Sequence, residues 1–371
     1  MIDDRIQSAR RTAYSLMGAG FHGTNGVSPT VCMAMYKCYV LPILLYGLEI
    51  MNISSKSLEK LSKFHLYILK AIQTSSKYTS TAAIYLTIGA LPVTAYIHKR
   101  ALTLLGCIMR SQNRRIRDWS LYMAGNCSYK SSSWFTFVCK LLKQYGLPEL
   151  CDIHSNPMPK FAWKSLVSKQ VNTFWNAQLM SEVQIRSTLI FLEIPKYGKP
   201  HQVWLSVNNN AKDVQRAHVK YKLLTGTYLV NQKKAKFSGK PTDSICTLCN
   251  SEDETIVHFL LKCSALSQPR SVIMDLVNYL KTVLPINEVK KILSDDSLLT
   301  QLIIDCSKLL SLPNRHLHNI ELITRKLCFN LHCRRRYLLE KICNNAQMKS
   351  SIVKAANWLG AEDQQIKGIY Q

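Results

Sequence analysis

Acidic residues are scarce in this 371-residue sequence, which has 23 Asp and Glu against 48 Lys and Arg and a formal net charge of +25. No acid occurs between Glu59 and Asp118, or between Asp213 and Asp243, and residues 334–336 are all arginine. Ordinary surfaces intersperse charges of both signs, so these acid-free runs indicate a surface that attracts polyanions. We therefore expect RNA or DNA as the partner, with an anionic membrane as the second possibility.

The few acids do not form the carboxylate cluster that polymerases and nucleases use to hold divalent metal ions. The adjacent pairs at 3–4 and 295–296 stand at expected helix starts, where acids favour the helix dipole. Asp275, Glu288 and Lys290 weakly match the D…E-x-K pattern of some nucleases. The residues around them predict a turn and a helix instead of the strands that such a site requires. We predict no catalytic residue and keep a divergent metal-dependent nuclease in 270–310 as an alternative.

An apolar leader is also missing, because the chain starts with MIDDRIQSARR. This start is not a secretory signal, so we expect an intracellular protein of the nucleus, the cytoplasm or both, whose 13 cysteines are thiols or metal ligands. The longest apolar window, 31–51, is interrupted by Lys37, Pro42 and Glu49. It predicts a buried helix kinked at Pro42, and we expect no membrane partner.

Strand-type alternation, internal repeats and low-complexity tails are absent. Apolar residues recur instead every three or four positions, which is the helical period. The predicted fold class is therefore mostly α. Helices are expected at 3–17, 58–72, 84–109 (a pair broken near Leu91 and Pro92), 137–145, 162–175, 213–224, 270–283, 297–311 and 320–342.

Three cysteines and one histidine fall at C-x2-C-x8-H-x4-C spacing: Cys246, Cys249, His258 and Cys263. Two close pairs of nitrogen and sulfur ligands are typical of structural zinc, and we predict such a site. Ser251 and Glu254 match a capping box and predict a helix that starts right after the first pair. A second group, Cys328, His332 and Cys333, is better explained as cysteines and a histidine of a helix than as ligands.

The basic runs supply the candidate contacts to nucleic acid. Lys and Arg on phosphates position a strand without reading its sequence, so little base preference is expected. Within or beside the second run, four aromatic residues are candidates for stacking on bases: Tyr197, Trp204, Tyr221 and Phe237. The candidate cationic contacts are Lys99, Arg100, Arg110, Arg114, Arg115, Arg117, Lys233, Lys234, Lys236, Lys240 and Lys262.

Three segments, RIQSARRTAYSLMGAGFHG, YVLPILLYGLEI and AIYLTIGALPVTAYIHKRALTLLG, resemble the region just after the polymerase palm in LINE-type, non-LTR retrotransposon reverse transcriptases. The Cys/His cluster is similar to the zinc-binding module near the C-terminus of those polyproteins. The resemblance covers residues 1–110 and 240–268, and does not extend to 111–239 or 269–371. Its most specific motif, L-P-x-L-x-Y-G-x-E, is formed by Leu41, Pro42, Leu44, Tyr46, Gly47 and Glu49.

The resemblance implies a nucleic-acid-binding C-terminal fragment of an RNA-directed DNA polymerase. In that family the catalytic aspartates lie in an aromatic-Ala-Asp-Asp hairpin, and nothing in this sequence matches it. The thumb would grip template–primer and the zinc module would hold element RNA or target DNA, with the element's own RNA as a partner in a ribonucleoprotein. Alone, the chain is expected to bind nucleic acid and not to polymerise.

The same resemblance, with the helical pattern, predicts four parts along the chain. A thumb-like helical domain (1–125) is followed by a helical linker with a basic segment (126–240), a CCHC zinc-binding module (241–268) and a C-terminal helical region (269–371). A host protein-interaction module derived from a retrotransposon, acting through the C-terminal helices, remains an alternative.

Overall fold

The computed structural model describes residues 1–24, 26–126, 133–195, 198–208, 210–238 and 244–367, excepting the side chains of 237–238 and 345–367. The described residues are mostly helical and contain no strand. An isolated antiparallel bridge joins Ile245 to Asp253. The predicted helical class is confirmed.

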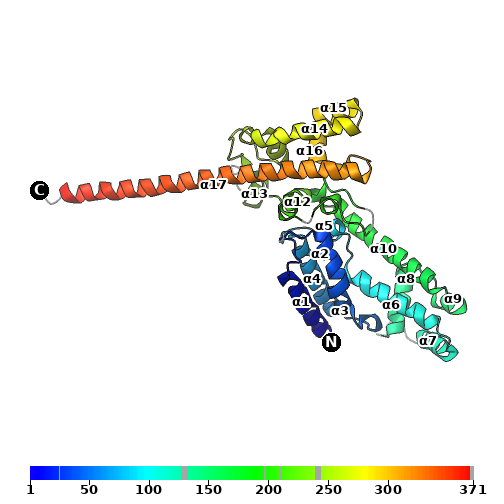
Figure 1. Cartoon of the computed structure of the whole chain (residues 1–371). Helices are drawn as coiled ribbons and strands as arrows, with labels where there is room; N and C mark the ends of the chain where they lie inside the picture. The colour runs from blue at the N-terminus through cyan, green and yellow to red at the C-terminus, as the bar shows by residue number, and fades with distance from the viewer. Residues whose placement is uncertain (25, 127–132, 196–197, 209, 239–243, 368–371) are drawn as a thin grey trace. The chain divides into compact units, whose positions relative to one another are not determined.

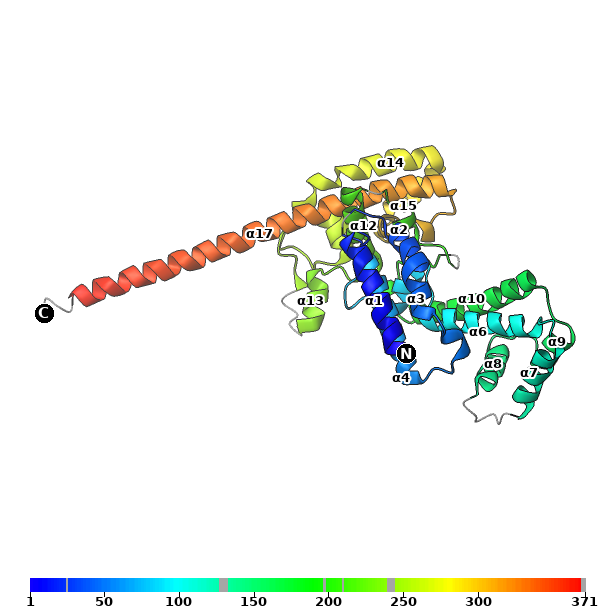
Figure 2. The same ribbon diagram turned by 60° about the horizontal axis from the view of Figure 1, so that its bottom comes forward.

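The chain divides into two compact units (Figures 1 and 2). The N-terminal unit contains Met1–Thr227 and Leu310–His318, and the C-terminal unit contains Tyr228–Leu309 and Asn319–Gln371. The boundaries of the four predicted parts, at 125/126, 240/241 and 268/269, each lie inside a unit, and the predicted linker (126–240) has residues in both units.

The N-terminal unit is built of helices joined by short turns. The expected helices at 3–17, 58–72 and 213–224 are α1, α4 and α12, and the expected broken pair is α5 and α6. The helices are α1 (Ile2–Gly18), α2 (Pro29–Met35), α3 (Leu41–Leu45), α4 (Ser55–Ile72), α5 (Thr81–Ile88), α6 (Val93–Met109), α7 (Arg114–Asn126), α8 (Trp134–Gln144), α9 (Leu150–Ser155), α10 (Lys160–Gln184), α11 (Gln202–Leu205) and α12 (Ala211–Leu224).

The apolar segment around Pro42 is a helix with a π-helical turn, Tyr36–Val40, between α2 and α3. The N–H of Leu41 bonds to the carbonyl of Tyr36, five residues earlier, so the distortion precedes Pro42. Among the described residues, no single helix is long and apolar enough to cross a membrane. Helices α5 and α6 meet that length and composition only together, as a pair bent by 59°.

Helices α6 and α10 lie side by side, and their close approach depends on one glycine. The indole of Trp163 on α10 is buried against α6 and donates a 2.8 Å hydrogen bond to the carbonyl of Leu102. A Cβ atom added at Gly106 would collide with that ring. Only glycine therefore leaves room for the indole at this position.

A buried histidine joins α4 to its neighbours in the same unit. The Nε2 atom of His65 donates to the carbonyl of Leu91 at 2.9 Å, so Nδ1 accepts from the hydroxyl of Tyr36 at 2.6 Å. His65 is fully buried, and both of its ring nitrogens have partners. Burial lowers the pKa of His65 to about 4, which keeps the ring neutral at pH 7.

The C-terminal unit contains the Cys/His cluster. The expected helix at 297–311 ends at Ile304, because the side chain of Asp305 accepts from Ser307 and starts a separate short turn there. The expected helix at 320–342 is part of a much longer one. The helices are α13 (Asn231–Ser238), α14 (Val272–Val283), α15 (Ile286–Ser294), α16 (Asp296–Ile304) and α17 (Asn314–Lys367). The first turn of α17 belongs to the N-terminal unit.

Candidate metal centre and basic surfaces

The first two sulfurs of the cluster are presented by a tight hairpin-like turn. The N–H of Cys246 bonds to the carbonyl of Glu252, and the N–H of Asn250 bonds back to the carbonyl of Cys246, both at 2.8 Å. Asn250 has a left-handed φ of 53°, which asparagine tolerates better than most residues. The turn thereby brings Cys246 and Cys249 to one side.

The other two ligand side chains flank a π-helical turn, His258–Lys262: His258 begins the turn and Cys263 directly follows it. The N–H of Cys263 bonds to the carbonyl of His258 at 2.9 Å, five residues back. In a regular α-helix residues five apart point about 140° away from each other, and the wider π turn reduces this angle. The π turn therefore lets His258 and Cys263 face the same point.

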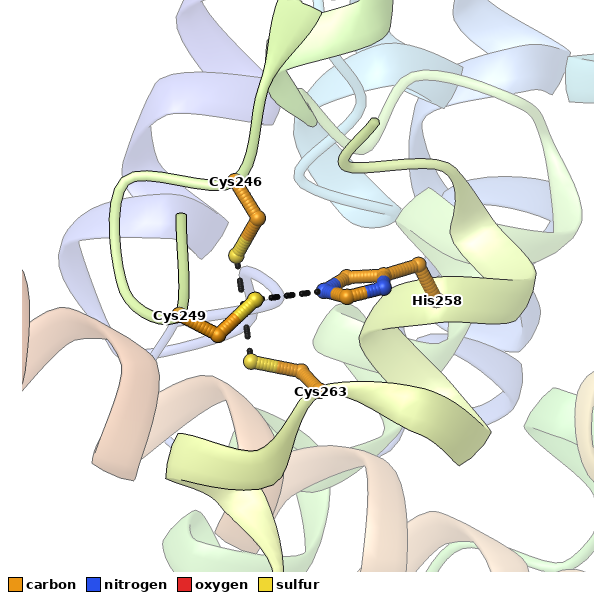
Figure 3. Close-up of side chains that lie close together, drawn as sticks. All are labelled: Cys246, Cys249, His258 and Cys263. Carbon is orange, nitrogen blue, oxygen red and sulfur yellow. Dashed lines mark hydrogen bonds between the residues drawn. The ribbon is translucent and has the colours of Figure 1, made fainter. Parts of the chain in front are cut away.

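The four side chains converge, as Figure 3 shows. Their ligand atoms all lie within 4.8 Å of one another. The Sγ atoms of Cys246 and Cys263 are 3.7 Å apart, and Sγ of Cys249 is 3.3 Å from Nε2 of His258. Tetrahedral zinc with bonds of about 2.3 Å to sulfur and about 2.0 Å to nitrogen requires separations of about 3.8 and 3.5 Å. The cluster can therefore hold a metal ion such as zinc.

A carboxylate lies next to the ring nitrogen of His258 that faces away from the sulfurs. Nδ1 of His258 lies 3.3 Å from Oε2 of Glu252, while Nε2 faces the sulfurs. Ligating histidines commonly donate their second N–H to such an acceptor, which fixes the tautomer and the ring orientation. Glu252, six residues before the histidine, is not among the residues that the sequence predicted for the site.

The thiols of the cluster differ in their proton affinity. Burial raises the pKa of Cys246 and raises that of Cys263 to about 12. Burial also raises the pKa of Cys249, but hydrogen bonds, first that with Ser251, outweigh it and lower the pKa to about 6. Three thiolates together are unfavourable without a cation, and a bound metal ion removes this penalty.

The predicted capping box is wrong. The short helix at 256–262 begins after Thr255, whose hydroxyl accepts from the N–H of His258 at 3.0 Å. Ser251 contacts Sγ of Cys249 instead, at 3.1 Å. The carboxylate of Glu254 is buried and faces Arg335 of α17, a partner that the local pattern could not reveal.

Among the described residues, the second Cys/His group does not belong to a cluster that could hold a metal ion. Cys328 is buried, Cys333 is exposed, and Nδ1 of His332 lies 3.0 Å from the hydroxyl of Tyr228. The acids of the alternative nuclease site lie on helices α14 and α15, and within the described part of the chain they belong to no group that could hold a metal ion.

The N-terminal candidate cations differ in how freely they are presented. Arg114 and Arg115 are exposed at the start of α7, and Arg117 is half-buried. Arg100 lies 4.0 Å from Glu49, and Arg110 donates to the carbonyl of Met158 at 3.4 Å. Lys99 is half-buried, and burial together with the nearby Lys37 lowers its pKa to about 8.

The C-terminal candidate cations lie in two places. Lys234 and Lys236 are exposed on α13, whereas Lys233 is half-buried and its pKa is lowered by burial and by Lys236. Lys262 pairs with Asp296 at 3.1 Å. Lys240 lies outside the described residues. No described residue forms an ion pair with Arg115, Lys234 or Lys236, so their charge is not neutralised by the described part of the chain.

Two of the four aromatic residues proposed to stack on bases are in the core, and Tyr197 and the side chain of Phe237 lie outside the described residues. Trp204 and Tyr221 are buried, with ring centroids 4.9 Å apart. The indole N–H of Trp204 donates to the side chain of Gln73 at 3.0 Å, and the Tyr221 hydroxyl lies 3.0 Å from that of Ser75. Both rings therefore hold the N-terminal unit together and cannot contact a strand.

Comparisons with protein-family models, curated proteins and solved structures gave no match to this chain. The helical fold and the Cys3His cluster are therefore supported by the structure alone, and the resemblance to non-LTR reverse transcriptases stays a prediction.

Proposed function

We propose that this chain is a zinc-stabilised nucleic-acid-binding fragment from the C-terminal part of a LINE-type reverse transcriptase. The observation that carries the proposal is the unbalanced positive charge of +25, with exposed cations on α7 and α13. A polyanion gains most from such a surface, because binding releases its condensed counterions.

The family part of the proposal is supported by the packing of the segments that resemble those enzymes. In the N-terminal unit, α1 packs against α3, and α6 packs against the turn Leu48–Ile50. Within the motif, Gly47 has the left-handed φ of 75° that the turn needs, and Arg5 of α1 lies 4.6 Å above the ring of Tyr46. The three segments thus belong to one packed body.

The zinc part is supported by the four-ligand geometry. A site with three sulfurs and one imidazole around the metal leaves no coordination position for a substrate, so its role is folding. Cys246, His258 and Cys263 are buried, which fits a metal that acts as part of the core.

A salt titration of binding tests this function. If the protein neutralises about six phosphates of a single strand, log affinity falls against log salt with a slope of about −4. Replacing both Lys234 and Lys236, which form no ion pair with a described residue, by Ala should flatten this slope by about 1.4, because each lost phosphate contact removes released counterion. Lys60→Ala with Lys63→Ala is the matched control: these exposed lysines already pair with Asp3 and Glu59 and should leave the slope unchanged.

Absence of any salt-dependent binding by the wild-type chain would refute the proposal. A second measurement addresses polymerase activity: with primed RNA template, Mg²⁺ and all four nucleotides, the isolated chain should extend no primer. Extension that is lost when an acid of this chain is mutated would contradict the assignment as a binding fragment.

A further inference from the structure

One face of α7 exposes two large aromatic rings in line with an arginine. Arg115, Trp119, Tyr122 and Asn126 recur at helical spacing, and all four are exposed. Trp119 is 65% exposed and Tyr122 is 64% exposed, with their ring centroids 6.4 Å apart and their planes tilted by 49°. Adjacent exposed aromatic side chains are a feature of binding surfaces.

The opposite face of α7 packs against other helices of the N-terminal unit. The helix packs against α6, α8 and α9, as Figure 2 shows at the end of the N-terminal unit. Ser120, on the packed face, is buried and donates to the carbonyl of Ile116 at 2.7 Å. The aromatic face is therefore a fixed surface on a supported helix.

The charge around these rings is positive. Arg114 has a side chain that is 85% exposed, and Arg115 is exposed beside it. The only acid of the helix, Asp118, is already engaged with Arg114 at 3.3 Å and with His154 at 3.1 Å. An anionic partner with flat rings matches both the exposed aromatic rings and the positive charge of this face. A basic or purely apolar partner could use the rings but not the charge.

We propose that this face of α7 is a stacking platform for single-stranded nucleic acid, with unpaired bases on Trp119 and Tyr122 and a phosphate on Arg115. Unpaired bases expose the ring faces that aromatic side chains need, and bases of a duplex are already stacked on each other. The inference rests on the proposed function and adds that the N-terminal unit prefers single-stranded to double-stranded nucleic acid.

The test measures binding of Trp119→Ala and Tyr122→Ala by fluorescence anisotropy, with oligo(U) and with a duplex of the same length. Each substitution should weaken oligo(U) binding at least about fivefold, the low end of the effect of one lost base stack. The salt slope should stay unchanged because no charge is removed. Affinity for the duplex should also stay unchanged, and Trp119→Phe, which keeps a ring face, should restore most of the oligo(U) affinity.

Tyr78→Ala is the matched control. This ring is 79% exposed in the same unit and lies 4.9 Å from the ammonium of Lys77, but it stands in the loop between α4 and α5. Its removal should leave affinity unchanged. If the wild type binds oligo(U) and Trp119→Ala binds it equally well, the platform is wrong and the proposed function stands. Equal losses for the duplex or for Tyr78→Ala also overturn the platform, and no binding by the wild type overturns both proposals.

Discussion

The carboxylate of Glu254 and the guanidinium of Arg335 form a two-point ion pair inside the C-terminal unit. Nε of Arg335 lies 2.6 Å from Oε1, and Nη2 lies 2.7 Å from Oε2. Their side chains are only 3% and 10% exposed, and the backbone N–H of Asn231 adds a third contact to the carboxylate at 2.7 Å. The pair connects the Cys/His cluster region with α17, and each charge depends on the other.

Arg335→Met should destabilise the C-terminal unit by about 3–5 kcal/mol, because the carboxylate of Glu254 would remain buried without its counterion. Arg336→Met is the control: Arg336 also pairs with a glutamate, Glu340, but both side chains are exposed and little change is expected. Urea unfolding followed by hydrogen exchange of α17 measures the difference. Equal effects of the two substitutions would contradict a structural role for the buried pair.

Cys249→Ser should remove the metal ion from freshly purified protein and unfold the region around the cluster. The wild type should contain equimolar zinc by elemental analysis, since one group of described residues can hold a metal ion. Cys333→Ser, at an exposed cysteine outside the cluster, should keep the metal. A wild-type protein without zinc, purified without chelators, would exclude the assignment.

Glu252→Gln should weaken zinc binding about 10- to 100-fold without removing a ligand, because the carboxylate orients His258 through Nδ1. Competition with a chromophoric chelator gives the affinity. Glu288→Gln on α15 serves as the control and should leave the affinity unchanged. A wild-type affinity in Glu252→Gln would show that the 3.3 Å contact does not position the ring.

His65 should make the N-terminal unit sensitive to acid. The ordinary pKa of histidine, 6.5, is lowered to about 4 in the fold by burial, so below pH 6.5 the unfolded chain binds a proton that the folded chain does not. Protons then favour unfolding, and stability falls as the pH decreases from about 6.5 to about 4, by about 3 kcal/mol for this group. His65→Gln should be less stable at pH 7 but lose less stability over that window, which thermal unfolding at several pH values measures.

Gly106→Ala should destabilise the N-terminal unit by about 1–3 kcal/mol, because the new methyl group meets the indole of Trp163 and forces α6 and α10 apart. Gly125→Ala is a matched change in another helix, where a Cβ meets nothing within 4 Å. That substitution should be neutral or slightly stabilising. Denaturation midpoints of the two variants decide whether the close packing exists in solution.

Features that depend on neighbouring residues in the sequence could be predicted. Ser28 followed by Pro29 is a local helix-start pattern, and the structure starts α2 there, with the Ser28 hydroxyl accepting from the N–H of Thr30. Asp295 caps α16, as the acid pair at 295–296 indicated. The Cys3His quartet was also visible, because turn and helix geometry bring together ligands that are close in sequence.

Features that depend on tertiary contacts could not be predicted. Glu254 resembled a helix-capping acid, yet its partner Arg335 lies 81 residues away. Trp204 stands near a basic run, yet it is buried, while Trp119 is exposed. Composition does not reveal which aromatic side chain the fold encloses, because burial depends on the neighbouring helices.

The π turn between His258 and Cys263 also restricts how this region can change in evolution. Each residue of an α-helix adds a rotation of about 100°, so insertion of one residue into 259–262 would place Cys263 six residues after His258 and turn its sulfur away from the other ligands. Deletion of one residue would leave the pair four apart, a spacing that a regular α-helix brings to one face without a π turn. Insertions should therefore be excluded from this short stretch even where substitutions accumulate.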